Sequence, residues 1–310
     1  MSSPCEMKMS TTAPRLPLDP RHVMLQFSRR GELAEGRFLY DEIAARMDER
    51  LRYIRVTPNA LMDAGSGAGH ALPLLQARYP QASYTGVDHS APVLALARAR
   101  HAPGSFRTWL DTLRRRDTAP RFVQADMAAT GLPPESLELV WSNLALHWHP
   151  QPDAVLAEWR RVLKIGGLAM FSWLGPGTFL ELRQALADAG LKTATPAFVD
   201  MHDFGDQLVE NGFADPVMDQ ETLTLTYETP ERLLQDVRAL GGNPAIGRRA
   251  GLPGRQWLQD LKDALAAQRG ADGRIALSVE VSYGHAWRAA ARQVGGETRL
   301  SVSAIGRKQG

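Results

Sequence analysis

The stretch that decides the fold of this chain is Asn59-Ala60-Leu61-Met62-Asp63-Ala64-Gly65-Ser66-Gly67-Ala68-Gly69. It predicts a short apolar strand, an acidic residue at the end of that strand, and a glycine-rich turn that opens a helix. Glycine lets the backbone turn sharply and approach a ligand closely because it has no Cβ atom. The fingerprint of dinucleotide-binding domains places its third glycine one position later, where this chain has His70. The spacing therefore departs from that of a dinucleotide site.

A second acidic residue follows the next predicted strand. Asp88 comes directly after the apolar run 83–87, at about the distance from the glycine turn where such folds place the carboxylate that binds a ribose. A glycine triplet alone is weak support for a ligand site. The ordered combination of strand, acid, glycine turn, helix, strand and second acid is much more specific. The alternative interpretation is an α/β domain whose glycine-rich turn binds no nucleotide.

Predicted strands and helices alternate along the first part of the chain, which indicates a parallel sheet with right-handed crossovers. The expected strands are 59–63, 83–87, 121–125, 137–143 and 168–173, with a turn at 164–167. The expected helices between them are 70–79, 91–100 and 152–163. Beyond residue 175 we expect helices at 178–189 and 202–211, then strands at 223–227 and 275–287. Residues 230–270 are interpreted as a helical insertion between the last two strands.

Composition narrows the class of protein. The 310 residues are 44% hydrophobic and 23% charged, which is the mixture of a globular chain with a sizeable core. A net charge of +2 gives no argument for nucleic-acid binding. No apolar run reaches the roughly 18 residues of a membrane-spanning helix, and residues 1–10 lack the apolar core of a signal peptide. The single cysteine, Cys5, excludes a multi-cysteine metal site and suits a reducing compartment. We expect a cytoplasmic protein that contacts neither nucleic acid nor membrane.

Two segments are expected to lie outside the regular core. Residues 1–20 are polar and interrupted by proline, which predicts a mobile tail ahead of a single domain at 21–310. Residues 101–120 have the character of an insertion rich in positive charge. Its basic residues are Arg107, Arg114, Arg115 and Arg116. The insertion is either a solvated charged surface or a docking site for an acidic partner.

The glycine turn and the two acids together resemble the S-adenosylmethionine site of class I methyltransferases, in which Asp63-x-Gly65-x-Gly67-x-Gly69 matches motif I and Asp88 matches motif II. This resemblance implies a Rossmann-like, seven-stranded, mostly parallel sheet with helices on both faces. It also implies that the three glycines bring backbone groups to the methionine part of the cofactor. Asp63 would orient the ammonium group, and Asp88 would accept both ribose hydroxyls.

The resemblance extends to the ends of the third and fourth predicted strands. Asp126 would accept the adenine amino group, the Met127 backbone would meet a ring nitrogen, and Asn143 would lie beside the methyl group. Taken alone, Asp126 is equally well interpreted as a helix-capping aspartate. His147 and His149 lack a nearby thiolate and make a poor zinc site, so we expect no metal. A loop that covers the methyl donor is the favoured interpretation of this pair.

Several stretches resemble a narrower family, the malonyl-acyl-carrier-protein O-methyltransferases of biotin synthesis (the BioC family). They are 142–148, 177–183, 202–208, 212–219 and 283–287. The resemblance implies methyl transfer from S-adenosylmethionine to the free carboxyl of a malonyl thioester, carried by acyl-carrier protein or by coenzyme A. A carboxylate is already ionised near neutral pH, so this displacement needs no strong base. Alignment of the reactants and desolvation would supply the catalysis.

The malonyl carboxylate must be oriented, and we expect Arg183 to hold it because a planar guanidinium binds a carboxylate bidentately. The competing interpretation is that Arg183 pairs with Glu181 or Asp188 on a helix surface. Tyr283 is expected to close the pocket from the last strand, and His147 to reach the substrate. His285 and Trp287 are also expected to close the pocket. The group Tyr40, Arg29 and Arg37 either belongs to a solvated helix face, which is the favoured interpretation, or lines the substrate mouth.

Two other functions stay open. Residues 27–31 and the C-terminal part also resemble assembly proteins of mitochondrial complex I that hydroxylate an arginine of a partner. A protein that binds the cofactor without transferring a methyl group would show the same motifs. Ser66 stands where many relatives have cysteine, a small change that should preserve the turn.

Overall fold

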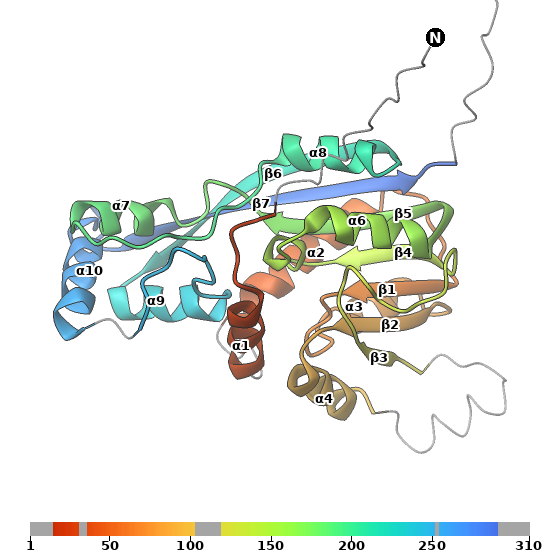
Figure 1. Cartoon of the computed structure of the whole chain (residues 1–310), viewed down its shortest axis with the longest axis horizontal. Helices are drawn as coiled ribbons and strands as arrows, with labels where there is room; N and C mark the ends of the chain where they lie inside the picture. Colours follow the sequence, from red (N-terminus) through yellow and green to blue (C-terminus); the bar gives the residue numbers. More distant parts are fainter. Residues whose placement is uncertain (1–14, 31–35, 103–118, 252–253, 291–310) are drawn as a thin grey trace, which may run out of the picture.

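A twisted seven-stranded sheet forms the centre of the computed structural model, which describes residues 15–30, 36–102, 119–251 and 254–290 (Figure 1). The strands are β1 (Ala60–Ala64), β2 (Ser83–Asp88), β3 (Arg121–Gln124), β4 (Leu137–Ser142), β5 (Leu163–Leu174), β6 (Phe213–Tyr227) and β7 (Ile275–Arg288). Their order in the sheet is β3-β2-β1-β4-β5-β7-β6. Strands β1 to β5 run parallel, and β7 is antiparallel to both of its neighbours. The predicted α/β, Rossmann-like fold class is confirmed.

Helices cover both faces of the sheet. They are α1 (Pro20–Arg30), α2 (Arg37–Leu51), α3 (Leu72–Arg78), α4 (Ala91–Arg100), α6 (Pro152–Val162), α7 (Leu180–Asp188), α8 (Met201–Glu210), α9 (Pro230–Ala239) and α10 (Arg255–Ala267). A central strand buries alternate residues on opposite faces. Leu139 and Trp141 of β4 pack in the core beneath α2 and α3, whereas Val140 packs in the core beneath α6 and α8.

The fifth strand differs from the prediction. We expected a turn at 164–167 before a strand at 168–173, but β5 already begins at Leu163. The pairing with β4 jumps from Leu137–Leu163 to Leu139–Leu168. Gly166 adopts a φ of +75°, so the extra residues loop out as an irregularity inside the strand rather than as a turn before it.

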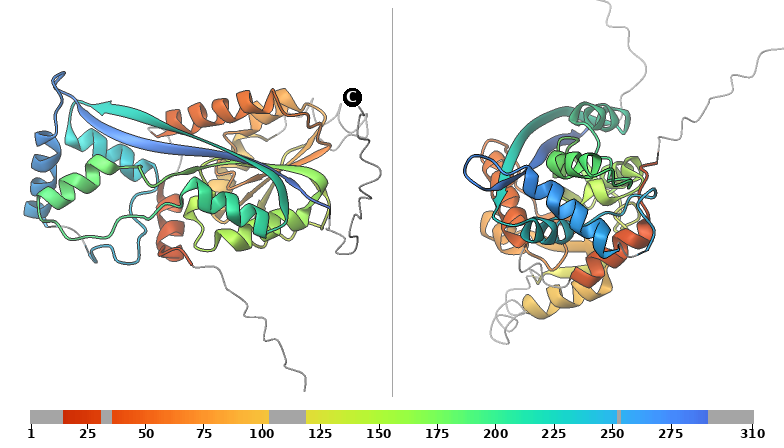
Figure 2. Two further views of the ribbon diagram at one scale, coloured as in Figure 1. Left: turned by 90° about the horizontal axis from the view of Figure 1, so that it is seen from above. Right: turned by 90° about the vertical axis from the view of Figure 1, so that its left-hand side faces the viewer.

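The last two strands are longer than predicted and form a ribbon that extends past the sheet (Figures 1 and 2). Strand β7 pairs with β5 over residues 281–287, while residues 275–280 of β7 pair with β6 alone. Helices α9 and α10 lie between β6 and β7 in the chain, and they pack with α7 at the projecting end of the ribbon. Leu233, Leu261 and Leu265 are buried there.

The N-terminal segment also differs from the prediction of a tail over residues 1–20. Leu18 is buried and forms a β-bridge with Ala245, and the Leu16 N–H donates to the Pro150 carbonyl at 2.8 Å. Asp19 then caps α1, because its carboxylate accepts from the N–H groups at the first turn of the helix. Residues 15–19 therefore form a strap over the body of the protein. Residues 1–14, and the arginines of the predicted insertion at 101–120, lie outside the described residues.

Across these described ranges, no helix has both the length and the apolar character that a membrane span requires.

Candidate active site

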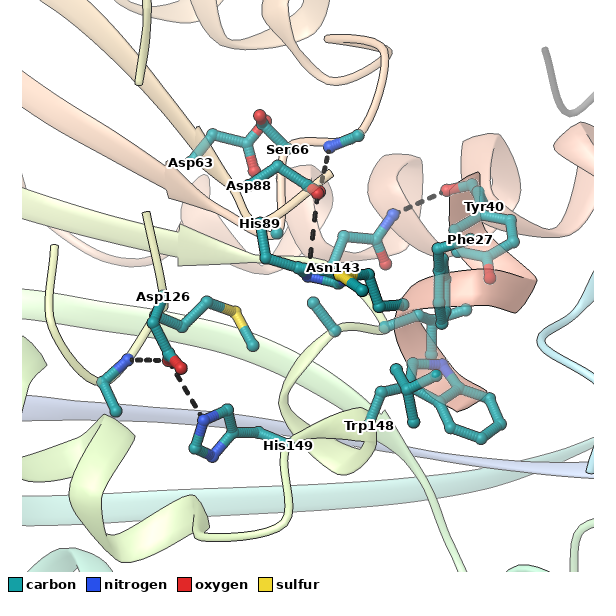
Figure 3. A pocket seen from close by; sticks show the side chains of 18 of the residues that line it. Phe27, Tyr40, Asp63, Ser66, Asp88, His89, Asp126, Asn143, Trp148 and His149 are labelled. Atoms are coloured by element: carbon teal, nitrogen blue, oxygen red, sulfur yellow. Dashed lines mark hydrogen bonds and ion pairs between the residues drawn. The ribbon is translucent and has the colours of Figure 1, made fainter. Parts of the chain in front are cut away.

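A cavity of about 420 Å³ opens where the parallel strands reach their carboxyl ends (Figure 3). Ligands of α/β sheets collect at this edge because the loops and helix N-termini converge there. Seven of the predicted cofactor residues line the cavity: Asp63, Gly65, Gly67, Asp88, Asp126, Met127 and Asn143. Helix α1 and the loop after β4 close the opposite side.

Asp88 and the glycine turn form one unit at the floor of this cavity. The Gly67 N–H donates to Oδ2 of Asp88 at 3.0 Å, and the Ser90 N–H donates to Oδ1 at 2.8 Å. Each carboxylate oxygen keeps a second lone pair for a ligand. Gly65 has a φ of +78°, and a Cβ atom there would overlap the Cβ of Ala145. The turn therefore requires glycine both for its conformation and for its close packing against the loop after β4.

Gly69, the third glycine of the motif, does not line the cavity. Its φ is +72°, and a Cβ atom at this position would lie 2.9 Å from the ring of His101, which follows α4. The glycine allows the turn to pack against the end of α4. The expected contact of Gly69 with the cofactor is thus corrected to a packing role.

Asp63 is a buried carboxylate at the end of β1. Its Oδ2 accepts a hydrogen bond from the Tyr84 hydroxyl at 2.7 Å, and its Oδ1 accepts none among the described residues. Burial raises the pKa of Asp63 to about 7, and the negative charge of Asp88 adds to the rise. A cationic group beside Oδ1 would stabilise the ionised form. The Ser66 hydroxyl beside it is also buried and has no hydrogen-bond partner in the described structure.

Asp126 and His149 form a pair at the other end of the cavity. The Ala128 N–H donates to Asp126 Oδ1 at 2.8 Å, and His149 Nε2 lies 3.1 Å from the same oxygen. The hydrogen bond from His149 is the main reason that the pKa of Asp126 is lowered to about 2. Asp126 therefore caps a tight turn and not the helix of the alternative interpretation, and its Oδ2 accepts no hydrogen bond from the described residues.

Asn143 is held by the protein at both ends of its amide. Its Nδ2 donates to the Tyr40 carbonyl at 2.9 Å, and its Oδ1 accepts from the Ser172 hydroxyl at 2.9 Å. These bonds tie α2 to the ends of β4 and β5. Tyr40 lines the cavity, whereas Arg37 pairs with Asp41 on the surface of α2, as the solvated helix face predicts.

His147 and Tyr283 do not line the cavity, so their expected contact with substrate is corrected. The 3₁₀ turn after β4 directs Trp148 to the cavity and His147 into the core. Burial lowers the pKa of His147 to about 3, so the ring is neutral. Tyr283 is buried on the face of the sheet below α2. Its hydroxyl donates to Glu221 at 2.7 Å, and the Arg50 guanidinium lies 3.8 Å above its ring.

Arg183 also lies away from the cavity, and both interpretations of its role are corrected. Its guanidinium donates to the carbonyl of Thr178 and, at 2.8 Å, to the carbonyl of Pro176. The side chain folds back toward the start of α7, where these two carbonyls of the preceding loop accept its N–H groups. Glu181 instead accepts from Ser278, and Asp188 accepts from Gln184. Arg183 borders a separate cavity of about 230 Å³, while His285 and Trp287 border neither.

Sequence reasoning missed the part of the cavity wall that α1 provides. Pro20, Val23, Met24 and Phe27 all line the cavity. The Phe27 ring contacts Trp148 edge to face, with 5.9 Å between the ring centroids. These residues are spaced i, i+3, i+4, i+7, which places them on one face of a helix. This spacing is the feature of the sequence that could have identified the cavity wall. Arg15 of the strap also lines the cavity.

Comparison with known proteins gives concordant matches. Residues 62–171 match a family model described as a methyltransferase domain. A malonyl-[acyl-carrier protein] O-methyltransferase of Laribacter hongkongensis is 46% identical over 82% of this chain and 84% of its own length. A protein of the same name from Gallionella capsiferriformans is 41% identical over 89% of this chain and 93% of its own length. Another from Halorhodospira halophila is 40% identical over 94% of this chain and 97% of its own length.

Solved structures show the same fold at low sequence identity. The YcgJ protein of Bacillus subtilis matches with a TM-score of 0.53 and 14% identity, over 81% of this chain and 99% of that chain. A structure from Bacillus halodurans matches with a TM-score of 0.54 and 15% identity, over 80% of this chain and 99% of that chain. Identities this low support the shared architecture alone.

Proposed function

We propose, since this chain belongs to the family of malonyl-[acyl-carrier protein] O-methyltransferases, that it methylates the free carboxylate of a malonyl group carried by acyl-carrier protein in biotin synthesis. The relatives favour this reaction over the hydroxylase-like assembly factor and over the protein that only binds a cofactor. The observation that carries the proposal is the cavity at the carboxyl edge of the sheet. Acids from three strand ends, Asp63, Asp88 and Asp126, meet the glycine turn there.

S-adenosylmethionine is the methyl donor, and it supplies an electrophilic methyl group on a sulfonium. The residues of the cavity fit such a molecule. The second lone pairs of Asp88 suit the two ribose hydroxyls. Oδ1 of Asp63 suits the ammonium group, because a cation would remove the burial penalty that now raises the pKa of this carboxyl.

The adenine end is assigned to the pair of Asp126 and His149. Oδ2 of Asp126 is free to accept from an amino group, while His149 fixes the carboxylate through Oδ1. The low pKa of Asp126 keeps it ionised, and therefore a hydrogen-bond acceptor, throughout the neutral range. Met127 lies next to it in the cavity wall.

The acceptor carboxylate needs alignment rather than a general base. Among the described residues, Arg15 is the arginine that lines the cavity, and its guanidinium has no hydrogen-bond partner there. We assign to Arg15 the role that Arg183 was expected to have. Its planar fork can hold both carboxylate oxygens and leave one lone pair of each oxygen for the displacement. Phe27 and Trp148 exclude water beside it.

The carrier of the malonyl group is assigned from the names of the relatives, all of which specify acyl-carrier protein. Malonyl-coenzyme A presents the same carboxylate on the same kind of thioester. We expect it to be a poorer substrate, because it offers no protein surface for recognition.

The test is incubation with methyl-labelled S-adenosylmethionine and malonyl carrier protein. We expect label on the carrier that mild alkali releases as methanol, as a methyl ester requires. Acetyl carrier protein lacks the free carboxylate and is the matched control. The proposal is overturned if neither malonyl thioester is labelled, or if the acetyl carrier is labelled equally well.

A further inference from the structure

The outer face of α1 combines positive charge with an exposed apolar side chain at the cavity mouth. We propose that Arg21, Leu25 and Arg29, the α1 stripe, are the surface on which the acidic acyl-carrier protein docks. This inference rests on the proposed function and adds the place where the carrier binds. The arginine-rich insertion at 101–120, whose arginines lie outside the described residues, stays a separate prediction.

The geometry of α1 connects the stripe to the cavity. Residues four apart lie on one side of a helix, so Arg21, Leu25 and Arg29 form a continuous row. All three are exposed, with 44% of Leu25 accessible. Val23 and Phe27 on the other side of the same helix line the cavity.

Met24 lies at the boundary between these two sides. It lines the cavity and is nevertheless 44% exposed. A carrier seated on the stripe would therefore be separated from the reaction site by no more than the width of one helix, roughly 10 Å. The flexible prosthetic arm of a carrier protein has to cross only that distance.

Helix α1 and its neighbour α4 carry positive charge only, and the Asp19 carboxylate beside Arg21 is paired with Arg248. Helix α1 contains Arg21, Arg29 and Arg30 and no acidic residue. It contacts α4, where the hydroxyls of Ser28 and Ser90 lie 3.1 Å apart, and α4 also has arginines but no acidic residue. Charges of one sign at the rim of an interface steer an oppositely charged partner and set the salt dependence of binding.

Among the described residues, the arginines of the stripe have no ion pair that would compete with a docked partner. Within the described part of the chain, the side chains of Arg21 and Arg29 form no ion pair, whereas Arg37 and Arg46 on neighbouring α2 pair with Asp41 and Glu42. Leu25 between the two arginines offers an apolar anchor of the kind that concentrates binding energy in protein interfaces. A positive, partly apolar row matches an acidic protein.

The experiment compares two double charge reversals that change the net charge equally. Arg21→Glu with Arg29→Glu alters the stripe. Arg52→Glu with Arg55→Glu is the matched control, because both arginines are exposed after α2, at the amino edge of the sheet away from the cavity. Each protein is assayed with malonyl carrier protein and with malonyl-pantetheine, which has the same arm without the carrier. Direct binding of the labelled carrier is measured by fluorescence anisotropy.

We expect the stripe variant to raise KM for malonyl carrier protein about tenfold or more at low salt, and the control variant to change it less than about twofold. Turnover of malonyl-pantetheine should stay within about twofold of wild type in both, because the stripe does not line the cavity. The difference between the variants should shrink at high salt. Circular dichroism and S-adenosylmethionine binding confirm that each variant is folded.

The outcomes separate this inference from the proposed function. If the stripe variant methylates malonyl carrier protein with an unchanged KM, the stripe is not the dock, although the reaction stands. If wild-type protein methylates neither substrate, the proposed function fails, and anisotropy still decides the docking question. If only the stripe variant loses carrier binding, the assignment of the α1 stripe as the docking surface is supported. If both variants bind the carrier equally, that assignment is overturned.

Discussion

Asp63 shows at the scale of one residue why the cavity favours a cationic ligand. The carboxyl is buried, has one hydrogen bond, and faces the charge of Asp88, so its pKa rises to about 7. Near pH 6 most molecules of the unliganded protein therefore carry a proton on Asp63. An ammonium group beside it favours the ionised form, so cofactor binding must release that proton when the pH lies below the raised pKa.

This coupling predicts that affinity for S-adenosylmethionine increases with pH. Between pH 6.0 and 7.5 we expect a rise of roughly five- to tenfold in wild-type protein, because the proton no longer has to be displaced. Asp63→Asn cannot ionise and should show a weaker affinity with a flatter pH profile. Isothermal titration calorimetry in two buffers of different ionisation enthalpy measures both the affinity and the released proton. A pH profile in Asp63→Asn as steep as in wild type would show that another group is responsible.

Asp88 tests the ribose assignment. Asp88→Ala leaves the Gly67 N–H and two ligand hydroxyls without their acceptor, and we expect cofactor affinity to fall by about 1–3 kcal/mol. Glu135→Ala removes an exposed carboxylate at the far side of β4 and is the control. Calorimetry should find the control unchanged. Wild-type affinity in a folded Asp88→Ala protein would refute the assignment.

Arg15 tests the carboxylate assignment. Arg15→Lys keeps the charge but loses the planar fork, so we expect KM for malonyl thioesters to rise about tenfold while cofactor affinity is unchanged. Arg183→Lys is the comparison, since Arg183 bonds only to backbone carbonyls outside the cavity. Steady-state kinetics with malonyl-pantetheine distinguish the two. If only Arg183→Lys impairs malonyl turnover, the assignment of Arg15 is wrong.

At this scale the sequence predicts residues whose position follows from local order. Asp63 and Asp88 end strands, so their place at the carboxyl edge follows from strand order alone. The direction in which a side chain points within a turn, or within one of the last strands of the chain, does not follow from strand order. His147 and His149 are two positions apart, and only the geometry of the intervening turn sends one to the core and the other to the cavity. In the same way, the register of β7 against β5 places the Tyr283 side chain on a face of the sheet away from the cavity.

Among the elements, the glycine turn is the one whose backbone cannot tolerate change. Gly65→Ala combines a positive φ with an overlap against Ala145, while Gly131→Ala has a φ of +71° and no neighbour within 4 Å. The control should lose about 1–2 kcal/mol from backbone strain alone. We expect Gly65→Ala to lose more and to weaken cofactor binding as well. Chemical denaturation gives the free energies of unfolding, and equal losses would contradict a packing requirement at Gly65.

Element boundaries were predicted well where hydrophobic runs stop at a glycine, proline or acid. Helix α4 begins and ends at the predicted residues, and β2 extends the prediction by one. Strand β6 was predicted too short because an edge strand exposes alternate residues, so its first half lacks an apolar run. The strap of residues 15–19 was missed because a five-residue segment with a proline at its centre shows no periodicity, and because its partners are distant in the chain, as when the Asp19 N–H donates to the Pro244 carbonyl.

For the whole molecule, the strap joins the cavity side of the sheet to the helical segment between β6 and β7. It bonds to the loop after β4 through Pro150 and to the segment after α9 through Pro244 and Ile246. Helix α1 continues from the strap and forms part of the cavity wall through Val23 and Phe27. The cofactor half of the sheet and the β6–β7 ribbon are therefore connected by the same N-terminal segment that forms the cavity wall (Figure 1).

The central claim is that this cavity brings a methyl donor to the free carboxylate of a malonyl carrier, and intact mass spectrometry of the carrier tests it most directly. After incubation with S-adenosylmethionine and wild-type protein, the malonyl carrier should gain the mass of one methylene group, located by fragmentation on the terminal carboxyl. The acetyl carrier should gain nothing, and Asp88→Ala should slow the gain. A malonyl carrier that keeps its mass with folded, cofactor-bound protein would contradict the account.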